Sequence, residues 1–167
     1  MRTFKRIIVA LLVVLIIIQF IRPERNISAS PSPADISTVY TIPANVSTVL
    51  KKACYDCHSN NTRYPWYANV QPVAWWLNDH IHEGKRGLNF SEFASYRIGK
   101  QYRKLDDVID EVKKGDMPLQ SYTLIHTNAR LTAEEKAVLT SWADAIRDTI
   151  RAKYPPDSLI QKNRGKR

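Results

Sequence analysis

Five consecutive residues, Cys54-Tyr55-Asp56-Cys57-His58, constrain this chain more than any other feature. Two thiols three positions apart, followed at once by an imidazole, form the pattern that attaches haem covalently to a polypeptide. Side chains one helical turn apart can form thioethers with the two vinyl groups of one porphyrin, and His58 then lies under the iron. As a neutral imidazole, His58 would ligate the iron while its other ring nitrogen is oriented by an acceptor. The motif therefore predicts one covalently attached haem c.

Three other uses of the two thiols compete with haem attachment. A zinc site could take His80 and His82 as further ligands, but zinc sites of this type usually separate their histidines by about three to five residues. A redox-active dithiol should lie at the mouth of a βαβ unit, which this region does not resemble. A disulfide between Cys54 and Cys57 would close too small a ring to stabilise the fold much. We favour haem over all three.

The net charge of +9 is concentrated at the two ends of the 167 residues. Residues 1–30 hold five Lys or Arg and one acidic residue, and residues 151–167 hold six and one. The 14 basic residues that remain between residues 31 and 150 are matched by 14 acidic ones. Because this central part is neutral, the charge does not predict nucleic-acid binding. The length allows one compact domain with appendages.

The N-terminus has the pattern of a membrane anchor. Basic residues precede an apolar run, residues 7–21, in which Gln19 is the one polar side chain. The pattern predicts a signal anchor over residues 1–22, with the rest of the chain in the periplasm of a bacterium. Cleavage at Ser28-Ala29-Ser30 is the alternative, but that site lies far beyond the apolar run. Residues 23–43 are rich in proline and serine and predict an extended linker.

Helical spacing of apolar residues predicts an all-α, cytochrome c-like domain over residues 44–151. A first helix from Ala44 carries its apolar stripe into Cys54, so the haem motif lies at its C-terminal end. A second helix is expected from Val73 and should end at Gly84 and Gly87. Further helices are expected over residues 91–96 and 103–114. In the last of these, four acidic residues should face solvent: Asp106, Asp107, Asp110 and Glu111.

The end of the predicted domain has its own signals. Thr132-Ala133-Glu134-Glu135 forms a capping box that starts a C-terminal helix. One face of that helix is expected to hold Val138, Leu139, Trp142, Ala145, Ile146 and Thr149. Pro155-Pro156 should end the fold and leave residues 152–167 as a basic tail.

Aromatic side chains are densest over residues 63–76. So many aromatic side chains are expected to pack against a large apolar surface, and a porphyrin provides one. Trp66, Tyr67 and Trp75 are the candidates for packing against haem. An ordinary hydrophobic core would also use these rings.

Short segments spread over residues 40–150 are similar to those of one known family. They are Cys54-Tyr55-Asp56-Cys57-His58-Ser59-Asn60, Tyr64-Pro65-Trp66-Tyr67, Pro72-Val73, Trp75-Trp76-Leu77, His80-Ile81, Gly84, Leu88-Asn89-Phe90-Ser91, Gly115-Asp116-Met117-Pro118, Tyr122, His126, Ala129-Arg130-Leu131 and Trp142. The chain thus resembles the bacterial haem-binding domain family of exported, cytochrome-like proteins. The resemblance implies a monohaem module attached through the CxxCH residues.

Met117 is the one methionine beyond the initiator, so it is the one candidate for a thioether ligand. Gly115 allows the chain to turn towards the iron, and Pro118 keeps the loop from becoming helical. Ligation by His58 and Met117 favours ferrous iron and suits electron transfer. Met117 as a mere packing residue is the alternative, with His80, His82 and His126 as reserve ligands.

These features predict a membrane-tethered c-type cytochrome that exchanges electrons with redox partner proteins and is not an enzyme. The alternative is a haem peroxidase, or a gas or redox sensor, with an open distal site. Arg63, His80 or His82 would then act as distal donors. A third option is a purely structural haem.

Overall fold

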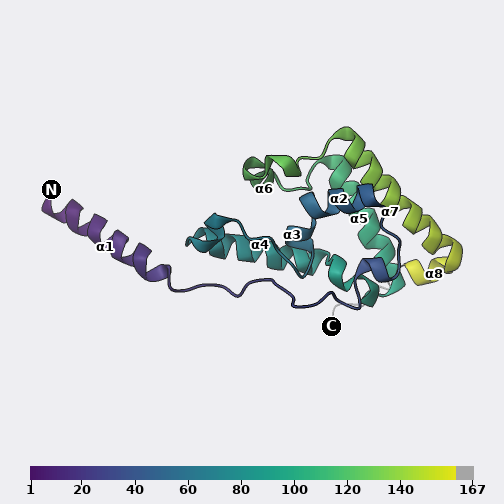
Figure 1. Ribbon diagram of the computed structural model, residues 1–167, viewed down its shortest axis with the longest axis horizontal. Coiled ribbons are helices and arrows are strands. Elements are labelled where there is room, and N and C mark those ends of the chain that lie inside the picture. Colours follow the sequence, from purple (N-terminus) through teal and green to yellow (C-terminus); the bar gives the residue numbers. More distant parts are fainter. Residues whose placement is uncertain (161–167) are drawn as a thin grey trace.

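The computed structural model describes residues 1–160, and within that range it contains helices and no strand (Figure 1). The α-helices are α1 (Arg2–Ile18), α2 (Ala44–Ala53), α3 (Tyr55–His58), α4 (Val73–Gly87), α5 (Ile98–Lys114), α6 (Gln120–Ile125), α7 (Ala133–Lys153) and α8 (Pro156–Leu159). Short 3-10 helices are η1 (Ile36–Thr38), η2 (Trp66–Asn69), η3 (Phe90–Ser95) and η4 (Thr127–Ala129). The all-α prediction is confirmed.

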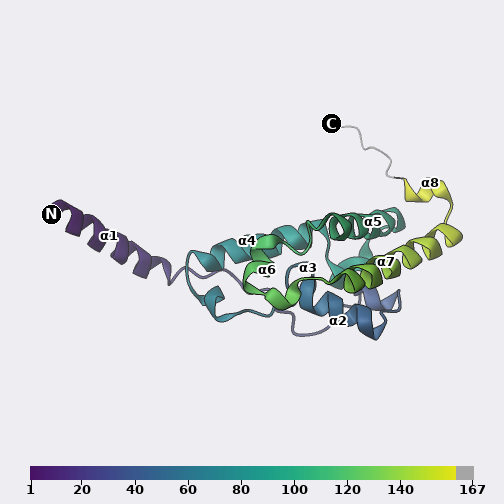
Figure 2. The same cartoon turned by 90° about the horizontal axis from the view of Figure 1, so that it is seen from above.

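The N-terminal helix α1 extends away from the other helices in both views (Figures 1 and 2). Its residues are apolar for most of its length, and none of them is buried. Among residues 1–160, no helix combines the length and the hydropathy that crossing a membrane requires.

The hydrophobic core lies mainly between α5 and α7, and α2 completes it (Figure 2). Leu50, Leu105 and Leu139, one from each helix, are fully buried. Helix α5 starts at Ile98, five residues earlier than expected, because its first turn also packs against the core. The expected face of α7 is partly wrong, since Ala145 and Thr149 are exposed. The buried side chains of α7 are Leu139, Trp142, Ala143, Ile146 and Ile150.

The predicted capping box at the start of α7 is confirmed. The Thr132 hydroxyl accepts a hydrogen bond from the Glu135 backbone N–H (3.2 Å), and the Thr132 N–H donates to the Glu135 carboxylate (2.9 Å). The same carboxylate lies 2.5 Å from Nζ of Lys52, so the cap also joins α7 to α2. Trp142 donates its indole N–H to the carbonyl of Thr41 (3.0 Å), just before α2.

Residues 23–43 do more than separate α1 from the other helices. Ile36 is fully buried in the core, and the Asn26 side chain donates to the Ser59 carbonyl (2.9 Å) beside α3. The spacer expected from the proline content therefore packs on the domain, because apolar residues between the prolines can be buried. Pro155-Pro156 does not end the fold, since α8 follows and packs on α5. The remaining residues of the expected basic tail, 161–167, lie outside the described residues.

Candidate haem site

The CxxCH residues lie where α2 gives way to α3. Cys54 has non-helical backbone angles (φ −122°, ψ −44°), so α2 stops one residue before it. The carbonyl of Cys54 then accepts hydrogen bonds from the N–H groups of Cys57 (3.2 Å) and His58 (2.9 Å). This single turn carries both thiols and the imidazole to the wall of one cavity.

That cavity has a volume of about 610 Å³ and is walled by α3, α4, α5 and the segment of residues 117–122. The volume lies within the range of roughly 300–1,000 Å³ that is usual for cofactor sites. Much of the wall is apolar, contributed by Ala53, Leu88, Phe90, Val108, Val112, Leu119 and Leu131. A large, flat, mostly apolar cofactor can be shielded from water in such a space.

The imidazole of His58 is fixed by two backbone carbonyls. Its Nδ1 lies 3.0 Å from the carbonyl oxygen of Gly84 and 3.0 Å from that of Leu88. Carbonyl oxygens only accept, so Nδ1 carries the proton and Nε2 keeps its lone pair. Burial lowers the pKa of His58, against the effect of the two hydrogen bonds, and favours the neutral ring. His58 is therefore prepared as a nitrogen ligand, as metal-binding histidines usually are.

Helix α4 ends at Gly87, one of the two glycines expected to end it, whereas Gly84 lies within the helix. A Cβ on Gly84 would lie 2.7 Å from the carbonyl oxygen and 3.1 Å from the Cβ of Cys57. A side chain at this position would push α4 away from the CxxCH turn. The absence of one lets the Gly84 carbonyl reach His58.

Met117 lines the same cavity as the thiols and His58. Helix α5 ends at Lys114, as predicted, and Gly115 follows it in the left-handed conformation (φ 83°). The backbone N–H groups of Gly115, Asp116 and Met117 all donate to the carbonyl of Glu111, at 3.0–3.2 Å. This tight turn directs the chain across the cavity. The four predicted haem-binding residues thus line one cavity: Cys54, Cys57, His58 and Met117.

Both cysteines are free thiols in the structure. Burial raises the pKa of Cys54 to about 12 and that of Cys57 to about 11. A redox-active dithiol needs a lowered thiol pKa, so this environment is unlike a thioredoxin-type site. Within residues 1–160, no group of three or more His, Cys, Asp or Glu side chains is arranged to hold a metal ion. The geometry thus gives no support to the zinc alternative.

The acidic face expected on α5 is only partly solvent-facing. Asp107 and Glu111 line the cavity together with Glu83 of α4. Lys104 also lines it and forms an ion pair with Asp107 (2.7 Å). The prediction is incomplete for Asp107 and Glu111: the Asp107 side chain is 47% exposed, but both side chains also lie on the rim of the cavity. Sequence spacing alone did not separate a cavity rim from open solvent.

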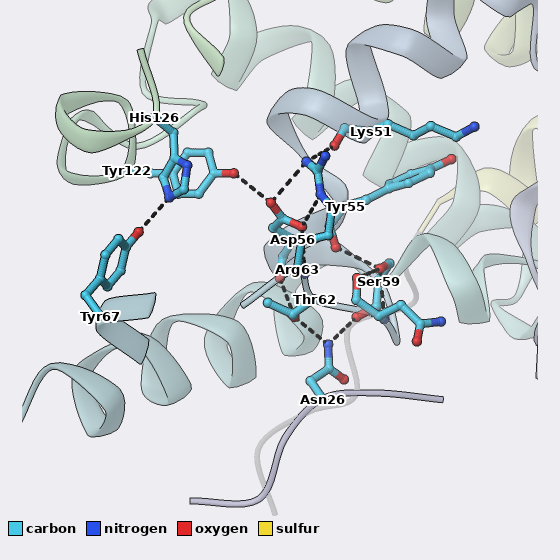
Figure 3. A network of polar contacts seen from close by, with 11 residues as sticks. Asn26, Lys51, Tyr55, Asp56, Ser59, Thr62, Arg63, Tyr67, Tyr122 and His126 are labelled. Carbon is cyan, nitrogen blue, oxygen red and sulfur yellow. Dashed lines mark hydrogen bonds and ion pairs between the residues drawn. The ribbon is translucent and has the colours of Figure 1, made fainter. Parts of the chain in front are cut away.

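Asp56, between the two cysteines, is the centre of a polar network that the sequence did not indicate (Figure 3). Its side chain is 12% exposed, and its carboxylate accepts from the backbone N–H (3.1 Å), Nε and Nη2 (both 3.2 Å) of Arg63. The hydroxyl of Tyr122, another cavity-lining residue, donates to the same carboxylate (2.8 Å). Burial raises the pKa of Tyr122, with the carboxylate adding to the shift.

The aromatic residues expected to pack on haem do not line the cavity. Trp66 is 80% exposed. The hydroxyl of Tyr67 is 2.6 Å from Nε2 of His126, and Trp75 donates its indole N–H to the carbonyl of Ile21 (3.0 Å). Of these three rings, Trp75 contacts the chain just after α1, Tyr67 contacts His126 beside α6, and Trp66 faces solvent. The aromatic rings at the cavity are Phe90 and Tyr122, which lie outside the aromatic-rich segment.

The structure also distinguishes among the three histidines that were the reserve ligands. His80 lines the cavity, with its Nδ1 2.9 Å from the Trp76 carbonyl. His82 is exposed, and His126 is bound to Tyr67. Arg63 is held by Asp56 and is not part of the cavity wall. Of the alternative axial or distal residues, the structure therefore brings only His80 to the site.

These residues fit the cofactor that the motif predicts. The cavity has a suitable size and is lined by the two thiols, by the Met117 thioether and by the His58 imidazole, whose proton is on Nδ1. Gly84, Asp56 and Tyr122 were named in the resemblance, but sequence analysis assigned none of them a role at the site. A glycine within a helical pattern is a signal for close packing, and could have indicated Gly84. Nothing in the local sequence marks the other two as partners, since 66 positions separate them.

Comparison with known proteins agrees with this geometry. The family model of the haem-binding domain matches residues 13–145, most of the chain. The chain belongs to the haem-binding domain family. No curated protein and no solved structure matches it significantly. The match supports haem as the cofactor and includes both the residues that pack before α2 and the segment that carries Met117.

Proposed function

We propose that this protein is a monohaem c-type cytochrome that carries electrons outside the cytoplasm and is not an enzyme. The observation that carries the proposal is the meeting of Cys54, Cys57, His58 and Met117 at one cavity. When bound, haem supplies one-electron redox chemistry.

Cys54 and Cys57 would hold the cofactor through thioethers. His58 would be the proximal ligand, with Nε2 available and Nδ1 held by the carbonyls of Gly84 and Leu88. Those carbonyls restrain the ring from turning, which limits the rearrangement that accompanies a change of charge. The apolar part of the wall would shield a bound haem from water and favour the less charged state of the site.

Met117 is the proposed distal ligand. A thioether opposite an imidazole favours ferrous iron and raises the reduction potential, as in electron-transfer cytochromes. The turn at Gly115 and the hydrogen bonds to Glu111 hold the start of this segment beside the cavity. A filled sixth position suits an electron carrier because it leaves no open site for a substrate.

We also propose that α1 tethers the domain to the bacterial inner membrane, with the domain in the periplasm. Support comes from the basic residues before the apolar run and from the apolar α1, of which no residue is buried. Its 17 residues would extend about 25 Å, and lipid thinning with snorkelling of flanking residues could accommodate the difference from a core of about 30 Å. Haem attached through CxxCH is consistent with an exported domain. The electron donor and acceptor would be proteins on the same side of the membrane.

A second function, with an open distal position, is favoured by one observation. His80 lines the cavity and could assist binding of peroxide or a diatomic gas if Met117 does not ligate. Carbon monoxide or cyanide added to the isolated protein separates the two functions. Slow or absent binding is expected for the electron carrier, and rapid binding would favour the open site.

The central experiment uses protein from a strain that can mature c-type cytochromes. We expect the pyridine haemochrome spectrum of a haem with two thioethers, and ferric and ferrous spectra typical of a low-spin site. Colourless protein, or pigment that dissolves in acidified organic solvent, would refute covalent attachment. Fractionation of the same cells tests the membrane tether separately.

A further inference from the structure

The segment that carries Met117 is held by few apolar contacts. None of residues 115–128 is buried, and Leu124 and Ile125 are 72% and 61% exposed. The chain returns to the core only at Ala129, which is fully buried. Because burial of apolar surface is the main source of stability, this segment must depend on specific polar contacts for its position.

Two hydrogen bonds between side chains join this segment to the elements around it (Figure 3). The Tyr122 hydroxyl donates to Asp56 of α3 (2.8 Å), and Nε2 of His126 lies 2.6 Å from the hydroxyl of Tyr67. The rings of Tyr122 and His126 stack with centroids 4.3 Å apart. The two attachments therefore support each other.

Asp56 is a rigid acceptor for Tyr122. Arg63 binds both oxygens of its carboxylate and also donates to the Lys51 carbonyl (2.6 Å). Asp56 lies between the two cysteines of the haem motif. A hydrogen bond to Asp56 therefore joins the Met117 segment directly to the turn that attaches haem. Hydrogen bonds to a carboxylate are about twice as strong as those between neutral groups.

We infer that the Tyr122–Asp56 hydrogen bond is a latch that holds residues 115–128 against α3, so that Tyr122 positions Met117 at the cavity. Tyr122 follows Met117 by five residues, and both side chains line the cavity. Tyr122 is thus a positioning residue. The inference that it controls axial ligation rests on the function proposed above, whereas its hold on the segment does not.

The test variant is Tyr122→Phe, which keeps the ring and removes only the hydroxyl. Hydrogen exchange is measured by mass spectrometry on the full-length haem-loaded protein in detergent. We expect the backbone amides of residues 115–126 to exchange roughly ten-fold faster or more, as the loss of a hydrogen bond to a charged group implies. The matched control is Tyr102→Phe, which removes a hydroxyl bonded to Arg147 away from the cavity and should leave this segment unchanged.

A second variant tests the latch from its other attachment. Tyr67→Phe removes the partner of His126, and we expect faster exchange in the same segment, but by less than in Tyr122→Phe because no charged group is involved. Circular dichroism confirms that each variant is folded. Unchanged exchange in folded Tyr122→Phe would overturn the latch.

Ligation is read separately, from the rate of cyanide binding to the ferric protein and the weak charge-transfer band of thioether-ligated haem. Tyr122→Phe should bind cyanide several-fold faster and weaken that band, whereas Tyr102→Phe should do neither. Faster exchange with an unchanged band would overturn the positioning of Met117. If the band is missing from the wild type too, the proposed ligation fails, and the exchange data alone decide whether the latch exists.

Discussion

The Nδ1 atom of His58 lies 3.0 Å from the carbonyl oxygen of Gly84, and the α-carbon side of Gly84 packs against the backbone of Cys57. One contact between α3 and α4 therefore serves two purposes. It brings the helices close together, and it selects the tautomer of the proposed proximal ligand. The size of residue 84 should affect both.

Gly84→Ala should lower the stability of the protein by about 1–3 kcal/mol, because its Cβ would lie 2.7 Å from the Cys57 carbonyl oxygen. It should also lower the yield of haem-loaded protein, since His58 would lose its orientation. Gly87→Ala in the same helix is the control for stability, as no atom lies within 4 Å of its Cβ; it is not a control for haem content because Gly87 lines the cavity. It should be neutral or slightly stabilising. Chemical denaturation compares the stability of the two variants, and haem content compares Gly84→Ala with the wild type. Equal stability of the two variants would contradict this account.

Replacing both Cys54 and Cys57 by serine should abolish covalent attachment. We expect the haem stain on a denaturing gel to disappear and any bound pigment to dissolve in acidified organic solvent. Met117→Ala should keep its stain, because the thioethers do not depend on the sixth ligand. Retention of stain by the double variant would show that attachment does not use these thiols.

Met117→Ala should convert a low-spin ferric spectrum to one with an open or water-filled sixth position, and cyanide should then bind rapidly. His80→Ala removes the other cavity-lining candidate and should leave the low-spin spectrum unchanged. A low-spin spectrum that survives Met117→Ala but is lost in His80→Ala would assign the sixth position to the histidine.

Stability should fall at acidic pH partly through Glu135. The hydrogen bond from Lys52 holds the pKa of Glu135 below its ordinary value of 4.5. Its contribution is therefore complete above that value and is lost as the pH falls through the lowered pKa of the folded protein. The pair is partly exposed, so the effect should be below about 1 kcal/mol.

Thermal unfolding of Glu135→Gln across pH 3–7 measures this effect, since glutamine keeps the capping box and removes the charge. The difference from the wild type should shrink as the pH falls. Glu134→Gln removes a charge from the same helical turn without the Lys52 pair and should show a smaller difference. A gap between wild type and Glu135→Gln that does not change with pH would rule out the ion pair as its cause.

Several parts of the fold were predictable because they depend on local sequence. The capping box at Thr132, the end of α5 before Gly115 and the start of α2 at Ala44 were predicted in place. Each depends on hydrogen bonds or backbone preferences within a few residues. The role of Gly84 within α4 was missed because a glycine can end a helix or allow close packing, and the segment that packs against it decides which.

The sequence by itself determined the motif that selects the cofactor, the helical class and the one candidate thioether. Those properties follow from the type of residue, from the spacing within a motif and from the periodicity of apolar residues, all of which can be read within one short segment of sequence. Only the tertiary structure decided that Asp107 and Glu111 border the cavity, that Trp66, Tyr67 and Trp75 lie elsewhere, and that Tyr122 bonds to Asp56. The physical reason is that these outcomes depend on which helices pack together, and that packing is set by the burial of the whole apolar surface.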